Sequence, residues 1–194
     1  LVVSDEFKAL FSESDLHARP VLETIREEWL NIIIGAFTPL ATLALFHMVT
    51  VFPLGWIYLQ SPGDVTAFLA IEIIGALFGL GTLIASGFIA DQIGRRTLLT
   101  YCAAGIALYA IVSPMILSLG RRGEALYVII GFSLLGLSFG QSSGAVASGF
   151  APRNRYTASN LTADLSWMFG AGFAPFVALY LTEHLGLWSA GAYL

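Results

Sequence analysis

Long apolar runs separated by short polar connections make up the chain after residue 29. A helix needs about 20 apolar residues to cross the core of a bilayer, and five of these runs are long enough. The pattern predicts five complete membrane spans and the start of a sixth, at about 30–59, 65–90, 98–119, 125–150, 157–181 and 187–194. Because helices satisfy their own backbone hydrogen bonds in lipid, we expect an all-α integral membrane fold.

The first 29 residues differ from the rest because charged side chains are frequent among them. Residues 21–29 follow Pro20 and predict a short amphipathic helix, since proline is favoured at the start of a helix. We interpret residues 1–29 as a solvated linker that contains this helix. Residues 30–194 are then a transmembrane helical bundle.

Proline and glycine mark the expected bends and close contacts of the spans. Pro39 and Pro53 should kink the first span, and a break is expected in the fifth span around Gly170, Gly172 and Pro175. In the second span, Gly75 and Gly79 share a helix face with Glu72. The fourth span has a longer small-residue stripe, made of Gly136, Gly140, Gly144 and Ser148. Such stripes let two helices approach closely in a membrane.

Composition supports the membrane assignment and excludes other classes. Hydrophobic residues make up 57% of the chain and charged residues 11%, against about 25% charged in ordinary globular proteins. The one cysteine, Cys102, lies in an apolar run, so a disulfide within this chain is excluded. No Cys/His cluster, phosphate-binding loop or basic patch is present. We therefore expect no metal, no cofactor, no enzyme activity and no nucleic-acid partner.

Basic residues set the expected orientation. If the N-terminal segment is cytoplasmic, seven of the nine basic residues lie on the cytoplasmic side and only Arg121 and Arg122 lie outside. Cytoplasmic loops of membrane proteins are enriched in lysine and arginine. The pattern predicts a multi-pass protein whose N-terminal segment is cytoplasmic.

The loop between the second and third spans contains a charged motif at fixed spacing. Its residues are Gly87, Asp91, Gly94, Arg95 and Arg96, in the sequence GFIADQIGRR. The charges exclude this stretch from the membrane core. A glycine permits the sharp turn between the two helices, while the missing side chain at the first glycine should let a neighbouring helix approach. The acidic residue can accept hydrogen bonds from an arginine or a helix N-terminus, and the arginines can contact anionic lipid.

This motif resembles the loop motif of the major facilitator superfamily, a class of secondary transporters. The connection after the fourth span, FAPRNRYTAS at residues 150–159, resembles a loop of the metabolite:proton symporter branch through Arg153 and Arg155, among others. Ala151 and Pro152 depart from that branch's pattern, and the acid usually found just before the loop is absent. The linker segments SDEFKAL and PVLETIREEW also look like that branch.

The resemblance implies a twelve-helix transporter in the cell (inner) membrane, of which this chain is the C-terminal half. The N-terminal six-helix half would be missing, so we interpret the chain as a fragment or incomplete half. The charged motif and the two loop arginines, Arg153 and Arg155, are then candidates for gating. The other possibility for the motif is that it only anchors the topology.

Three ionisable side chains lie within the proposed spans, namely His47, Glu72 and Asp164. Such residues are expensive to bury in a membrane and are functional candidates by default. Glu72 could be a proton carrier or a protonated residue held in a helix contact. His47 could relay protons, contact substrate, or simply pack.

Asp164 is the leading candidate for proton transfer. It belongs to a stripe at helical spacing that we expect to face a water-filled cavity, made of Thr157, Asn160, Asp164, Trp167 and Ala171. The alternative is that Asp164 caps or hydrogen-bonds a neighbouring helix. In the fourth span, the stripe Ser138, Gln141 and Ser142 is polar enough to line water. Gln141, Ser142 and Asn160 are suited to hydrogen-bonding a polar substrate, and Trp167 could stack on it or serve packing.

The leading hypothesis is proton-coupled symport of a small polar metabolite, of the organic acid, amino acid or betaine class, by alternating access. One alternative is an uncoupled facilitator or sugar-type porter. Another is a non-transporting, receptor-like or structural membrane component. The expected partners are membrane lipid, the substrate, protons and the six-helix half absent from this chain.

Overall fold

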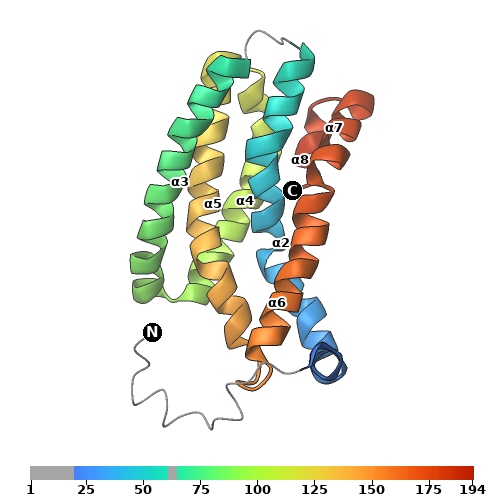
Figure 1. Cartoon of the computed structure of the whole chain (residues 1–194). Helices are drawn as coiled ribbons and strands as arrows, with labels where there is room; N and C mark the ends of the chain where they lie inside the picture. Colours follow the sequence, from blue (N-terminus) through green and yellow to red (C-terminus); the bar gives the residue numbers. More distant parts are fainter. Residues whose placement is uncertain (1–19, 61–64) are drawn as a thin grey trace.

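A computed structural model describes residues 20–60 and 65–194, and the described chain forms a bundle of long helices (Figure 1). The helices are α2 (Val21–Gln60), α3 (Val65–Ile93), α4 (Arg95–Leu117), α5 (Arg121–Ser148), α6 (Arg155–Ser166), the π-helix η3 (Trp167–Gly172), α7 (Ala174–Leu185) and α8 (Trp188–Gly191). No strand occurs among these residues. The expected all-α fold is confirmed.

Five helical segments of the described chain are long and apolar enough to cross a membrane. They are Val21–Leu59, Val65–Ile93, Arg95–Leu117, Arg121–Ser148 and Arg155–Leu185. The last consists of α6, η3 and α7 together, and α8 follows where a sixth apolar run begins. The structure is thus that of a polytopic membrane protein.

The first span and the helix expected before it are one element. α2 is helical from Val21 to Gln60 and includes Pro39 and Pro53. No proline lies between Pro20 and Pro39, so nothing separates the charged segment from the span. Figure 1 shows the first turns of α2, in dark blue, almost end-on, while the rest of the helix runs along the bundle. The beginning of α2 therefore crosses the end of the bundle. The linker residues 1–19 lie outside the described residues.

Helices α3 and α5 pack against each other through the small residues of both. A Cβ atom at Gly75 would overlap Val128, and one at Gly136 would overlap the Gly79 carbonyl oxygen. Further along, Gly140 faces the Ser86 hydroxyl. This confirms the predicted close contact, in which backbone-to-backbone approach replaces side-chain packing.

Hydrogen bonds through two tyrosines join α2, α4 and α5 in the core. The Tyr127 hydroxyl of α5 donates to the Met48 carbonyl of α2, and the Tyr109 hydroxyl of α4 donates to the Tyr127 carbonyl at 3.0 Å. Both tyrosines are buried. A buried hydroxyl needs a partner, so these bonds set where the three helices meet.

The fifth span is interrupted where the sequence predicts a break. The π-helix η3 covers Gly170 and Gly172, and α7 begins at Ala174 with Pro175 in its first turn. Gly170 brings η3 against α2, where a Cβ atom would lie 2.9 Å from the Leu40 carbonyl oxygen. Proline and glycine together disrupt the regular ladder of hydrogen bonds, and π-helical turns are frequent at functional sites.

Candidate functional site

A cavity of about 210 Å³ lies between α2, α5, α6 and the start of η3; its lining is mainly apolar but includes three serines and an asparagine, and we call it the polar cavity. We define the polar cavity by its lining residues Pro39, Leu43, Phe139, Ser142, Ser143, Val146, Ser159, Asn160, Ala163 and Trp167. Three of the predicted substrate residues, Ser142, Asn160 and Trp167, are therefore brought together from α5, α6 and η3. Hydroxyl and amide groups beside an indole ring can hydrogen-bond and stack on a small polar molecule.

Trp167 connects the polar cavity to an aromatic cluster on α2. Its ring centroid lies 5.9 Å from that of Phe46 and 6.2 Å from that of His47, in edge-to-face arrangements. Trp167 and Phe139 also line a second cavity of about 170 Å³, which is almost wholly apolar and reaches α3 at Gly79. The indole thus lines both cavities.

The predicted stripe on the fifth span divides into exposed and buried residues. Asn160 and Asp164 are exposed, and Trp167 is 43% exposed. Thr157 and Ala171, at the two ends of the stripe, are buried. The Asp164 side chain forms no hydrogen bond or ion pair with the residues that the structure describes. The helix cap or helix contact considered for it is thus not formed within residues 20–60 and 65–194.

The two other ionisable residues have buried polar atoms without a partner. The Oε1 atom of Glu72 and the Nδ1 atom of His47 are buried and form no hydrogen bond with any described residue. Glu72 precedes Gly75 by one turn on the α3 face that packs on α5. Unpaired buried polar atoms are costly, so each requires a proton, water or another partner.

The polar stripe on α5 does not line open water as predicted. Ser138 and Gln141 are both buried between helices, and the Ser138 hydroxyl donates to the Leu134 carbonyl of its own helix. Ser142, which is also buried, lines the polar cavity. Close α3–α5 packing covers this part of α5, so the expectation is wrong for Ser138 and Gln141.

Gln141 instead joins the charged motif to the α3–α5 contact. Its Oε1 atom accepts a hydrogen bond from Arg95 Nε at 3.1 Å, and its Nε2 atom donates to the Ser86 hydroxyl at 3.1 Å. The guanidinium group of Arg95 lies over Gly144, where a Cβ atom would be 2.8 Å from Nη1. We call Ser86, Gln141 and Arg95 the polar relay. It ties the turn between α3 and α4 to α5.

The other residues of the charged motif lie on the exposed side of the turn between α3 and α4. Gly94 has a φ of 86°, which other residues rarely adopt. Asp91 and Arg96 are exposed, and Asp91 forms no hydrogen bond or ion pair with Arg95 or with a helix N-terminus among the described residues. Gly87 has open space where its Cβ atom would be, so a close helix approach there does not occur within the described chain. α5 instead approaches the α3 face of Gly79 and Ser86.

The two predicted loop arginines have different surroundings. Arg153 forms an ion pair with Glu27 of α2, with Nη2 and Oε2 3.2 Å apart. Arg155 instead donates to the Phe150 carbonyl at 3.5 Å. The neighbouring Asn154 is buried and donates to Glu27 Oε2 at 3.0 Å and to Glu28 Oε1 at 3.2 Å. We call Glu27, Glu28, Arg153 and Asn154 the end clasp, because they join the start of α2 to the loop before α6.

Sequence reasoning missed Ser86, Glu27 and Asn154. Each has its partner far along the chain: Asn154 and Glu27 are 127 positions apart, and Ser86 and Gln141 are 55 apart. A helical pattern shows neighbours three or four residues away and gives no signal for such pairs. No group of three or more His, Cys, Asp or Glu side chains able to hold a metal occurs in the part of the chain that the structure describes.

The polar relay predicts a stability effect for Gln141. Replacing it with leucine should lower the stability by about 1–3 kcal/mol, because Arg95 and Ser86 lose buried hydrogen-bond partners. Thermal unfolding in detergent would measure the loss. Ser148→Ala is the control, since the Ser148 hydroxyl bonds only to the Ala145 carbonyl of its own helix. If the stability is unchanged and the KM for transport rises, Gln141 contacts the substrate, as the sequence suggests.

Comparisons with known proteins agree on the class of protein. The profile of the family described as "Sugar (and other) transporter" matches residues 57–194. A Haemophilus influenzae protein named "Putative metabolite transport protein" is 29% identical over 189 residues, covering 90% of this chain and 42% of that protein. The Escherichia coli "Inner membrane metabolite transport protein YhjE" is 27% identical over 209 residues, covering 95% of this chain and 47% of that protein. No solved structure gives a significant match.

The chain spans a little less than half the length of the curated relatives it matches. A half-length chain is consistent with five membrane-spanning segments and the start of another apolar run. The family profile covers most of the chain, including the charged motif, the polar relay and the part of the polar cavity that α5, α6 and η3 form. The chain therefore belongs to the sugar (and other) transporter family of the major facilitator superfamily.

Proposed function

We propose that the complete protein is a secondary active transporter that moves a small polar metabolite together with protons by alternating access. The observation that supports this best is the polar cavity, where Ser142, Asn160 and Trp167 converge beside the interrupted fifth span. Interrupted helices at mid-membrane depth are a common way to build transporter binding sites, because the break frees backbone groups for ligands. The lining offers uncharged hydrogen-bond donors and acceptors next to an aromatic side chain, which suits a small polar substrate.

The polar cavity has no basic lining residue. An anionic substrate would therefore need a cationic partner from another part of the protein. Organic acids, amino acids and betaines remain the proposed substrates, with their uncharged or cationic part bound here. An indole ring such as that of Trp167 can also attract a substrate cation.

Asp164 is the proposed proton acceptor. It lies on α6 one turn after Asn160, which lines the polar cavity, and its exposure leaves it open to water. A carboxylate in a membrane span takes up a proton when its water is displaced, because desolvation disfavours the charged form. Glu72 and His47, with their buried unpaired atoms, are the second and third candidates.

The motif and the end clasp are proposed as gating elements. The polar relay holds Arg95 against α5, and it leaves Asp91 and Arg96 free to contact another segment of the complete protein. Charge contacts that form in one transport state and break in the other would bias the equilibrium between states. We place this end of the bundle, where α2 begins, on the cytoplasmic side of the cell membrane because seven of nine basic residues then lie inside.

Asn160→Ala tests the substrate role of the polar cavity. Losing one hydrogen bond to a neutral group costs about 0.5–1.5 kcal/mol, so the KM should rise by about twofold to tenfold with folding intact. Uptake by the full-length protein in proteoliposomes would measure the change. The control is Ser118→Ala at the end of α4, because its hydroxyl donates to the Met115 carbonyl of its own helix and it does not line this cavity. An unchanged KM at unchanged expression contradicts the assignment.

An uncoupled facilitator or sugar-type porter is the runner-up. The polar cavity suits a facilitator as well as a symporter. The two functions differ in whether substrate movement is coupled to protons. Uptake against a pH gradient, with and without a protonophore, decides between them: a symporter loses accumulation when the gradient collapses, whereas a facilitator keeps its initial rate. A protein that binds substrate in proteoliposomes but moves none would support the receptor-like alternative.

A further inference from the structure

The start of α2 has three chemically distinct sides. One side faces the bundle, where Thr24 is fully buried and Glu28 is half-buried. A second side is apolar and exposed, with Leu22 74%, Ile25 40% and Trp29 56% exposed. Glu23 and Arg26 lie on the remaining exposed side. On an isolated solvated linker these apolar side chains would gain nothing from sharing one side.

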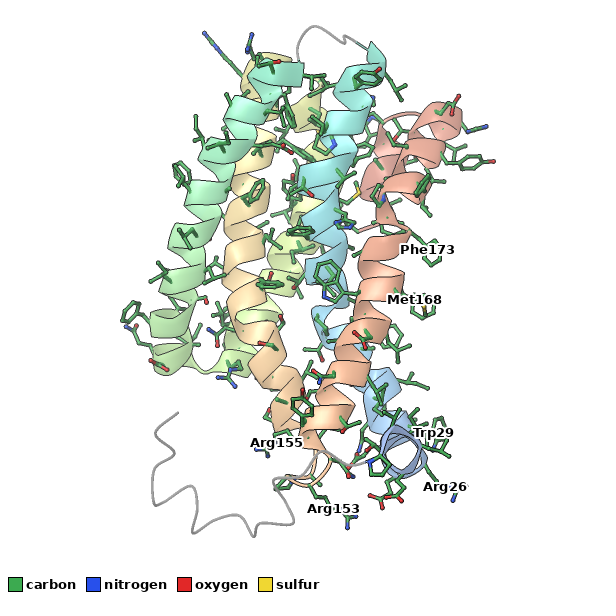
Figure 2. All side chains as sticks on the ribbon, viewed as in Figure 1. Arg26, Trp29, Arg153, Arg155, Met168 and Phe173 are labelled. Carbon is green, nitrogen blue, oxygen red and sulfur yellow. The ribbon has the colours of Figure 1, made fainter. Side chains whose placement is uncertain are left out.

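The geometry places this segment across the end of the bundle. Figure 1 shows its turns almost end-on beside the lower end of α6, and Figure 2 shows Arg26 and Trp29 projecting from it away from the bundle. The end clasp holds the segment there through Glu27 and Glu28, which contact Arg153 and Asn154. Because the rest of α2 runs along the bundle as a membrane span, its first turns lie near the membrane surface.

We propose that residues 21–29 form an interfacial helix that lies in the phospholipid headgroup layer at this end of the bundle. Leu22, Ile25 and Trp29 enter the boundary with the acyl chains, and Arg26 binds a lipid phosphate. An amphipathic helix in this position buries its apolar side by several ångströms, and tryptophan favours the boundary because its ring is apolar and its N–H is polar. Arg26 reaches the phosphates on its long stem.

The way the charges are paired indicates that lipid, and not water, surrounds the apolar side. Glu27 and Glu28 are turned toward the end clasp, where an arginine and an amide satisfy them. Arg26 has no ion pair with a described residue, so it is the free charge nearest the apolar side and suits a phosphate. The anchored helix would hold the end clasp at a constant depth in the membrane.

A fluorescent probe placed in turn on two different sides of the first part of α2 tests the proposal. In the full-length protein without other reactive cysteines, Ile25→Cys and the matched control Glu23→Cys are each labelled with an environment-sensitive fluorophore. Both are reconstituted in vesicles of phosphatidylethanolamine and phosphatidylglycerol. A lipid nitroxide near the headgroup should quench the probe at residue 25 several-fold more than at residue 23, and aqueous iodide should do the reverse. Trp29→Ser should weaken the lipid quenching at residue 25.

Two results would overturn the proposal. Equal quenching of both probes by iodide would show a solvated helix. A probe at residue 25 that neither quencher reaches would show that another protein segment covers the apolar side. Both variants replace exposed side chains, so the labelled proteins should elute and melt like the parent. If Ile25→Cys does not, Leu22→Cys on the same apolar side replaces it.

Discussion

Asp164→Asn in the full-length protein is expected to abolish proton-driven uptake while leaving substrate exchange across the membrane measurable. Asparagine keeps the size and polarity of the aspartate but cannot bind and release a proton. Exchange needs only the movement of the loaded transporter, whereas accumulation needs the protonation cycle. Because Asp164 is exposed and unpaired among the described residues, the substitution breaks no contact that holds the fold described here.

Uptake driven by a pH gradient and counterflow of labelled substrate in the same proteoliposomes measure the two activities separately. Glu183→Gln is the matched control, since Glu183 is an exposed acid near the other end of the fifth span, on α7. Undiminished proton-driven uptake by Asp164→Asn would exclude Asp164 as the proton acceptor. Glu72→Gln and His47→Gln would then be tested in the same way, because their buried unpaired atoms make them the next candidates.

Gly136→Ala is expected to destabilise the bundle strongly. Its Cβ atom would overlap the Gly79 carbonyl oxygen and the Thr82 hydroxyl, and it would lie 2.9 Å from the Leu83 backbone nitrogen. Two of these three atoms are backbone, so the helices must move apart, and the α3–α5 contact loosens along its length. Overpacking of this kind costs about 1–3 kcal/mol and occasionally more. Thermal unfolding in detergent, followed by loss of monodisperse protein, would measure it.

Gly81→Ala on α3 is the matched control. A Cβ atom there has no neighbour within 4 Å among the described residues, and alanine is the better helix former by about 1 kcal/mol. The control should therefore be neutral or stabilising. If both variants melt like the parent, helices α3 and α5 do not pack as closely as described, and the position of the polar relay between them would also be in doubt.

The local features of the fold were predictable from the sequence. Apolar runs of sufficient length predict the spans, and the glycines at helical spacing predict that the second and fourth spans each have a close helix contact, since both are properties of neighbouring residues on one helix. That these two spans contact each other is shown only by the structure. Gly170, Gly172 and Pro175 likewise predict the break in the fifth span, which the structure shows as η3. The continuity of α2 was missed, because a charged segment before an apolar one suggested a boundary where the backbone has none.

The candidate site was predictable only in part. Ser142, Asn160 and Trp167 were each selected for their chemistry on separate helices, and the structure joins them around one cavity. Gln141 was selected on the same grounds, but its amide is occupied by Arg95 and Ser86. A side chain one position from Ser142 points about 100° away around a helix, and only the position of the facing helix decides what it meets.

The sequence by itself determined a helical membrane bundle, its close-packed glycine stripes and the charged turn between α3 and α4, because length, hydropathy and spacing act within a single helix. The tertiary structure decided which polar residues share a cavity and which lock helices together. It also decided how the start of α2 is held, through partners 126 and 127 positions away. Those pairings depend on how helices from distant parts of the chain are placed, and no local pattern contains that information.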